Sequence, residues 1–498
     1  MVLNKGNLAL NSNLLLNITF SLFPISFIFG NLITNLNFLV FCCLGIFRLR
    51  SKILTNKLNL PLKIISLFFL LVLFSTILNF AESLYLGKYD KYDSTQLIKS
   101  ILFLRFFLIL LIIYLLSKFD IINYKFFFIF AAIFPVIISI DVIFQYIFGF
   151  NVIGIKGLER HNPSFFGDEL ISGGYIKNFA FFSIFFIINK LRNENTLSNI
   201  ILLILTICIL STGIHLSGNR MPYVLFLFGL FLLFIFGKDL RKILLISYCI
   251  IYIIFQTLVS IDVNLRYAHG YFVNYASQAI VSISNQAVKL VSKNQEKKEK
   301  DTNSLSKNNK QVEQEIVEIK DDVLNRTGNS RLVHVKARDL EGTWETRLHE
   351  DPEEHGYKKL VFTGIEVWKK NKIFGNGIRS FRFECRKIIN EQKRGLCSNH
   401  PHNYYVEILI DLGIVGAILT IGIAFLFIVF LLRNFKALKK EKSIENLFLL
   451  AAILSLFLEV FPLRSSGSIF TTNNTTYIIL MSSIILCYSN LLARKNFR

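Results

Sequence analysis

The chain has 498 residues, 53% of which are hydrophobic, and its mean hydropathy is +0.50. This composition excludes an ordinary water-soluble domain and is typical of a protein that crosses a membrane many times. A formal net charge of +21 also occurs in proteins that bind nucleic acids, but the positions of the charged residues argue against that class.

Apolar runs long enough to span a membrane occur about 12 times. The sequence therefore predicts an all-α, polytopic integral membrane protein with about 12 transmembrane helices. The first two runs follow each other closely and are also consistent with one re-entrant hairpin. We place the runs near 13–30, 31–47, 60–80, 97–117, 126–148, 173–189, 197–214, 220–237, 242–260, 408–432, 445–463 and 475–493.

Lysine and arginine residues gather in alternate short loops, whereas the intervening short loops hold few. The rich loops lie at 48–63, 118–125, 190–192, 238–242 and 433–442. This positive-inside pattern predicts that both termini are cytoplasmic and that the long region 261–403 lies outside the cytoplasmic membrane. Topology thus accounts for the charge, and no nucleic-acid partner is expected. No cleavable signal peptide is expected either, because no clear small-residue cleavage site follows the first apolar run.

These signals predict three parts: an N-terminal bundle of about nine spans at 1–260, a partly helical external loop domain at 261–403 between the ninth and tenth spans, and about three spans at 404–498. Within the loop, the stretch 292–322 is rich in Lys, Glu, Gln, Asn and Asp. That composition predicts a solvated helix or disorder, and we assign it no chemistry.

Two polar residues lie within the fifth apolar run. Asp141 and Gln145 are four positions apart, on one helical face and toward the external end. An ionisable residue inside a span is a functional candidate, and an interhelical hydrogen bond is the alternative. In the loop that follows, Arg160 and His161 are candidates to meet a diphosphate or a sugar, and Glu169 to orient either one. Solvated loop charge is the alternative for all three.

Arg220 opens the eighth predicted span at its external end. Ser217, Gly218 and Asn219 precede it and supply turn residues and helix-cap groups. A guanidinium beside free backbone N–H groups is well suited to bind phosphate. The alternative is an arginine that only anchors the helix at the headgroup layer.

Cysteines fall into two groups. Five lie in apolar runs and are expected to be small buried residues. Cys385 and Cys397 instead share the external loop. In an oxidising compartment a disulfide between them would stiffen the approach to His402, and two free thiols are the alternative.

The stretch 398–416 lies where the long polar region ends and an apolar run begins. Pro401 fixes the backbone before the turn, and Asn403 is a good N-cap for a helix that starts directly after it. Gly413 and Gly416 are three positions apart, which would let another helix approach closely.

One face of that helix is polar. Asn403, Glu407 and Asp411 repeat every four residues, with His402 at the head of the stripe. Ordinary interfacial polar residues would show the same spacing. A histidine, an amide and two carboxylates at a membrane surface also suit a reaction centre for a lipid-borne polar substrate.

The pattern His-Asn, nine residues, Gly-x-x-Gly resembles the signature of the O-antigen ligase and O-antigen polymerase superfamily. Its members are bacterial polytopic membrane glycosyltransferases that use polyprenyl-diphosphate-linked glycans. His402, Asn403, Gly413 and Gly416 fall on this pattern without a gap. The segments Arg160–Glu169, Ser217–Arg220 and Gly375–Gly416 also resemble the family.

The resemblance implies an O-antigen ligase in the bacterial inner membrane, with its active site on the periplasmic side. The donor would be an undecaprenyl-diphosphate-type glycan, and the acceptor a sugar hydroxyl on lipid A–core. His402 would be the general base or would orient the acceptor hydroxyl, and Glu407 or Asn403 would fix its tautomer. The donor diphosphate would be held by Arg220 together with Arg331 or Arg382. Arg160 and Glu169 would support the site.

No cofactor is expected, and no metal, because His400 and His402 alone are too few ligands for zinc. The sequence leaves three alternatives open. The enzyme would extend the glycan on its carrier as a polymerase, or transfer it to protein as an O-oligosaccharyltransferase. A transporter or flippase is the alternative from another class, although the polar clusters lie at one face rather than near the middle of the membrane.

Overall fold

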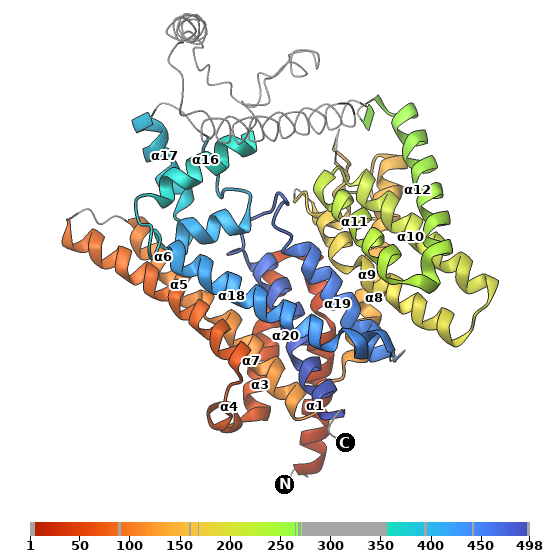
Figure 1. The fold of residues 1–498 in the computed structure, drawn as a ribbon, viewed down its shortest axis with the longest axis horizontal. Helices are drawn as coiled ribbons and strands as arrows, with labels where there is room; N and C mark the ends of the chain where they lie inside the picture. Colours follow the sequence, from red (N-terminus) through yellow and green to blue (C-terminus); the bar gives the residue numbers. More distant parts are fainter. Residues whose placement is uncertain are drawn as a thin grey trace, which may run out of the picture. The chain divides into compact units, whose positions relative to one another are not determined.

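The computed structural model describes residues 5–87, 91–158, 161–167, 169–263, 265–266, 270, 356–392, 396–440 and 443–495. The chain divides into two units, one formed by 1–258 with 356–498 and the other by 259–355. The first unit is a bundle of helices (Figure 1). In the described residues the only other secondary structure is two isolated bridges in the loop 149–161. The predicted all-α class is therefore confirmed for these parts of the chain.

The helices of the first half follow the predicted apolar runs closely. They are α1 (Lys5–Ser21), α2 (Phe23–Ser26), α3 (Gly30–Leu49), α4 (Lys52–Thr55), α5 (Leu60–Tyr85), α6 (Lys91–Phe103), α7 (Arg105–Lys118), α8 (Tyr124–Phe148), η1 (Ser164–Phe166), α9 (Ser172–Asn193), α10 (Leu197–Leu216), α11 (Arg220–Phe236), η2 (Lys238–Leu240) and α12 (Arg241–Ile261). After the long loop come α16 (Gly356–Trp368), α17 (Phe381–Gln392), α18 (Tyr404–Lys440), α19 (Ile444–Glu459) and α20 (Thr472–Lys495).

Among the described residues, seven helical stretches are long and apolar enough to cross a membrane. They are Gly30–Leu49, Leu60–Tyr85, Asp93–Lys118, Tyr124–Phe148, Leu197–Leu216, Lys238–Ile261 and Tyr404–Asn434. All seven coincide with predicted spans, which supports a multi-pass membrane protein. Other predicted spans, including α9, form helices that are not among the seven, so the number of about 12 is not confirmed.

The first two apolar runs form a helical hairpin. The turn between them includes Gly30 with φ +83°, a value that favours glycine. Arg48 Nε donates to Asn13 Oδ1 at 2.8 Å, and Asn37 Nδ2 donates to the Thr19 carbonyl at 3.1 Å. These bonds hold α1 and α3 side by side. The start of α1 and the end of α20 lie at the same end of the bundle (Figure 1), as the prediction of both termini on one side requires.

A small apolar core joins α16 and α17 to the start of α18. Its buried members are Leu360, Val367, Phe381, Cys385, Ile388 and Ile410. Burial of such side chains contributes on the order of 1.5–3 kcal/mol each. The two short helices are therefore packed against the first turns of α18, directly after His402.

Candidate active site

The start of α18 is capped as the sequence predicts. Asn403 Oδ1 accepts hydrogen bonds from the backbone N–H groups of Tyr405 at 3.0 Å and Val406 at 3.2 Å. The same side chain donates through Nδ2 to the Pro462 carbonyl at 2.9 Å. The cap residue therefore also attaches the α19–α20 loop (460–471) to the start of α18.

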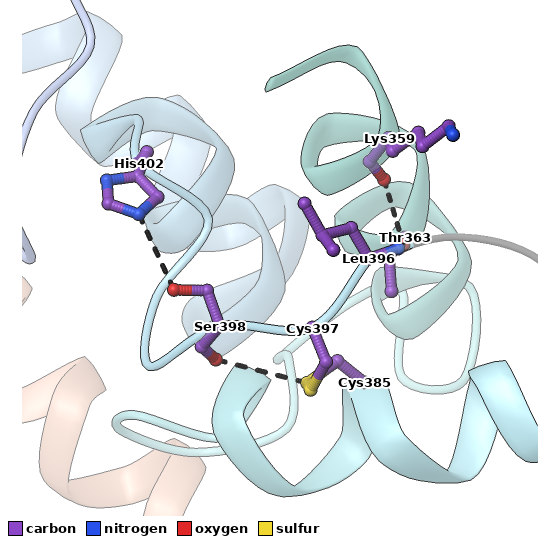
Figure 2. The surroundings of a disulfide bond; sticks show 7 residues. All are labelled: Lys359, Thr363, Cys385, Leu396, Cys397, Ser398 and His402. Carbon is purple, nitrogen blue, oxygen red and sulfur yellow. Dashed lines mark hydrogen bonds between the residues drawn. A yellow bond between two sulfur atoms is a disulfide. The ribbon is translucent and has the colours of Figure 1, made fainter. Parts of the chain in front are cut away.

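His402 directly precedes this cap and has a left-handed backbone, with φ +56°. Such a conformation costs roughly 1–3 kcal/mol in a non-glycine residue and persists only where neighbouring contacts impose it. One such contact is the Ser466 N–H, which donates to the His402 carbonyl at 2.9 Å. The ring is half-buried, and the Ser398 hydroxyl lies 3.4 Å from its Nε2 atom. Figure 2 shows the two side chains facing each other. The imidazole is thus fixed by its backbone and by its ring.

Both histidines of this loop are neutral near pH 7. Burial lowers the pKa of His402 below its ordinary value of 6.5, and a hydrogen bond to the Ser466 backbone acts in the opposite direction. Burial, with His402 as a neighbour, lowers the pKa of His400 to about 4. The two ring centroids are 4.2 Å apart. A neutral imidazole has a lone pair that accepts a proton, which is what a general base requires.

A disulfide holds the loop before His402. Cys385 of α17 is bonded to Cys397, with their Cα atoms 5.4 Å apart, so the structure favours the disulfide over two free thiols. Leu396 N–H donates to Thr363 Oγ1 of α16 at 3.1 Å. In Figure 2 the loop runs from the disulfide past Ser398 to His402. The disulfide and α16 therefore anchor the residue that contacts the imidazole.

The two carboxylates of the α18 stripe bind loops. Both side chains are buried. Glu407 accepts from Ser468 Oγ at 2.6 Å and from the Ile469 N–H at 2.8 Å. Asp411 accepts from the Arg379 N–H at 2.6 Å and from Ser380 Oγ at 2.7 Å. The stripe thus fixes two loops around His402. That Glu407 or Asn403 sets the imidazole tautomer stays a prediction, and the Ser398 hydroxyl is the group observed at Nε2.

Gly413 interrupts α18 with φ +66° and ψ −162°, a backbone conformation that is not helical. A Cβ atom there would overlap the Ile373 carbonyl. The Ile414 N–H donates to the Lys372 carbonyl at 2.9 Å, which satisfies a backbone group left open by the kink. The neighbour at Gly413 is therefore the turn between α16 and α17, where the sequence predicted another helix. The glycine is needed for a kink, a role that spacing alone does not reveal.

A buried ion network that the sequence analysis missed lies beneath the loop 460–471. Glu459 of α19 pairs through Oε2 with Lys177 of α9 and with Arg464, each at 2.5 Å. Tyr404 donates its hydroxyl hydrogen to Glu459 Oε1 at 2.7 Å. The signal was present in the sequence, because a lysine inside a predicted span requires an acidic partner from another span.

The Arg220 loop joins the predicted Arg160–Glu169 loop. His161 Nδ1 lies 3.3 Å from the Ser217 carbonyl, and Asn162 Nδ2 donates to the Leu216 carbonyl at 2.7 Å. Arg220 opens α11, as predicted, and its side chain is exposed. Glu169 is also exposed. Arg160 lies outside the described residues.

Asp141 and Gln145 of α8 hold the loop 149–167. Asp141 accepts from Ser164 Oγ at 2.5 Å and from the Val152 N–H at 3.2 Å. Gln145 accepts from the Ser164 N–H at 2.7 Å and donates to the Ile155 carbonyl at 2.9 Å. The observed role is therefore the anchoring of a loop, which differs from the interhelical bond considered from the sequence.

Of the two candidates for a second diphosphate-binding arginine, the structure describes only Arg382. Arg382 of α17 lies within electrostatic reach of His400. Its Nε atom is buried without a hydrogen-bond partner among the described residues. Arg331 lies outside the described residues. In the described part of the chain, no three His, Cys, Asp or Glu side chains are grouped to hold a metal ion.

The model of one protein family, described as O-antigen ligase, matches residues 202–421. The match covers 220 of the 498 residues. The match runs from α10 past Arg220 to α18 and includes His402, Gly413 and Gly416, so the resemblance predicted from those residues is confirmed. The matched segment is therefore similar to the O-antigen ligase family. No curated protein matches the chain.

Proposed function

We propose that the protein is an O-antigen ligase that moves a glycan from a polyprenyl diphosphate to a sugar hydroxyl of lipid A–core, at the periplasmic face of the bacterial inner membrane. The observation that carries this proposal is the fixed position of the His402 side chain. Its neutral imidazole is fixed at the start of α18 by Ser466 and Ser398, within the segment that matches the O-antigen ligase family.

In the proposed reaction, the acceptor oxygen attacks the anomeric carbon of the donor sugar. The bond from that carbon to the diphosphate oxygen breaks, and its electron pair leaves with the polyprenyl diphosphate. The acceptor proton passes to the His402 imidazole. A single displacement inverts the anomeric centre, and no further reactant is needed.

The diphosphate is already a good leaving group, so its departure needs stabilisation of negative charge more than a proton. Arg220 supplies a guanidinium at the first turn of α11, where backbone N–H groups and the helix dipole also favour an anion. Arg331 or Arg382 is proposed to complete this site, with Arg160 and Glu169 in support. Arginine suits this role because its planar fork binds two phosphate oxygens together.

The replacement of His402 by Ala tests the proposal. With purified lipid-linked donor and lipid A–core acceptor, the transfer rate should fall roughly 10²- to 10⁴-fold, which is the usual contribution of a general base. Donor affinity and the melting temperature of the protein should stay unchanged. An unchanged transfer rate would remove His402 from the mechanism.

The product identifies the acceptor class. A ligase attaches the glycan to lipid A–core, whereas a polymerase leaves a longer glycan on the carrier lipid. Transfer to a protein would indicate an oligosaccharyltransferase. Passage of intact donor across the membrane without a new glycosidic bond would indicate a transporter instead.

A further inference from the structure

Residues 460–466 of the α19–α20 loop are bound to the segment that starts at His402. The Ser466 N–H donates to the His402 carbonyl at 2.9 Å. The side chains of Asn403 and Tyr405 donate to carbonyl groups of the same loop, at 2.9 Å and 2.5 Å. The left-handed backbone of His402 persists only where neighbouring contacts impose it. The position of this part of the loop therefore affects the backbone conformation of His402.

One side chain folds this part of the loop back onto α19. Arg464 pairs through Nη1 with Glu459 Oε2 at 2.5 Å, and the same Nη1 atom donates to the Glu459 carbonyl at 2.8 Å. Its guanidinium also lies 5.3 Å from the centre of the Tyr404 ring, and Tyr404 donates its hydroxyl hydrogen to Glu459. Arg464 therefore joins the end of α19, the loop and the first residue of α18.

The contacts of Arg464 are buried and strong. The Glu459 side chain is 3% exposed and that of Arg464 is 13% exposed, so solvent and salt screen the pair only weakly. On the other side of Ser466, Glu407 of α18 accepts hydrogen bonds from residues 468 and 469. Ser466 thus lies between two points at which a buried carboxylate holds the loop.

We propose that Arg464 is a positioning residue for His402 in glycan transfer. It holds the loop so that Ser466 sets the backbone of His402, and the imidazole is thereby directed at the acceptor hydroxyl. The inference rests on the proposed function and gives a role to an ion network that the reaction itself does not use. Lys177, the other cation bound to Glu459, lies on α9, so its loss leaves the pair between Arg464 and Glu459 in place.

Arg464→Met and Lys177→Met separate positioning from stability. Each variant removes one cation from Glu459, but only Arg464 belongs to the loop. Both variants should lower the melting temperature of the full-length protein in detergent, because a buried carboxylate loses a partner. Transfer from lipid-linked donor is measured below both melting temperatures. Only Arg464→Met should lower kcat, by roughly 10- to 100-fold with the KM for donor unchanged, because a displaced base loses its geometry.

A second measurement does not depend on catalysis. Diethyl pyrocarbonate modifies neutral imidazoles, and mass spectrometry of peptide fragments reports its rate at His402 separately from that at His161. In Arg464→Met, His402 should be modified faster than in the wild type, because a loosened loop exposes its half-buried ring. His161 should react at the wild-type rate, and Lys177→Met should show wild-type rates at both histidines. Equal losses of kcat in the two variants, or a wild-type rate at His402 in Arg464→Met, would overturn the positioning role.

Arg464→Lys decides the question if Arg464→Met does not fold. Lysine keeps a charge for Glu459, but its single ammonium group does not reproduce the planar guanidinium that also lies over the Tyr404 ring. His402 should then be modified faster than in the wild type, with a smaller loss of kcat than in Arg464→Met. A wild-type rate of modification would contradict the inference. If His402→Ala leaves transfer unchanged, the proposed function fails, and the modification rates still decide whether Arg464 positions the imidazole.

Discussion

The loop that carries His402 and the loop that carries Arg220 are held in different ways. The His402 loop is fixed by a disulfide, by the Asn403 cap and by the Ser466 hydrogen bond. The Arg220 loop is bound to its neighbour through backbone carbonyls, by His161 and Asn162, and Arg220 itself is exposed at the first turn of α11. The first loop holds the His402 imidazole in place, whereas the second leaves the Arg220 side chain exposed.

This difference matches the chemistry proposed for the two residues. A general base acts only within hydrogen-bond reach of the proton it accepts, so small displacements are costly. A cation that binds a diphosphate interacts over a longer range and tolerates movement of its ligand. The comparison predicts that changes which loosen the His402 loop slow transfer, whereas changes at Arg220 weaken donor binding.

The largest effect is expected from Glu459→Gln. The variant leaves Lys177 and Arg464 buried without their acidic partner, and loss of one partner from a buried ion pair costs roughly 3–5 kcal/mol. The melting temperature in detergent should fall, and transfer should slow more than donor binding weakens. Glu445→Gln is the control, because Glu445 is exposed on the same helix. Equal melting temperatures for the two variants would show that the network does not stabilise the fold.

The next effect is expected from the replacement of both Cys385 and Cys397 by Ser. The two cysteines are 12 positions apart, and a disulfide that closes a loop of this size contributes about 2–4 kcal/mol. Unfolding by denaturant should show this loss, and transfer should fall while the affinity for donor stays constant. Cys43→Ser, at an exposed free cysteine, serves as control. A drop in donor affinity instead would mean that the loop binds donor rather than positioning His402.

A smaller effect is expected from Arg220→Lys, which keeps the charge but loses the two-pronged contact to phosphate. The KM for donor should rise about tenfold with kcat nearly unchanged. Protein stability should not change, because the side chain is exposed. Arg50→Lys, at another exposed arginine, controls for the substitution. A loss confined to kcat would contradict the assignment of Arg220 to binding.

The smallest effect concerns pH. In the proposed mechanism the neutral form of His402 accepts the proton, and burial lowers the pKa of His402 below 6.5. The plot of kcat/KM against pH should therefore stay level as the pH falls through 6.5 and decline only at lower values. Ser398→Ala removes the hydroxyl at Nε2 of His402 and should shift the pH at which kcat/KM declines. If kcat/KM of the wild type instead declines at or above pH 6.5, the imidazole is not buried as described.

Much of the fold was predictable because it depends on local signals. Long apolar runs predict helices wherever backbone groups must be satisfied inside a membrane. Asn403 predicted a cap, which the structure has at that residue. The His402 and Gly413 pattern predicted the family that matches residues 202–421.

Other features depended on partners far away in the chain. Lys177 and Glu459 are 282 positions apart, and Gln96 and Ile378 are also 282 positions apart. The spacing of Glu407 and Asp411 correctly placed them on one face, but it did not reveal that this face binds two loops. Periodicity along one helix says which residues share a face and does not say what packs there.

The sequence by itself predicted a helical membrane protein that resembles the O-antigen ligases, with His402 at the start of a span. Only the tertiary structure decided how His402 is fixed and which loops bind the carboxylates of its helix. The physical reason is that hydrophobic periodicity and helix capping act between residues a few positions apart. Buried hydrogen bonds and ion pairs instead form between whichever polar groups the packed helices bring together.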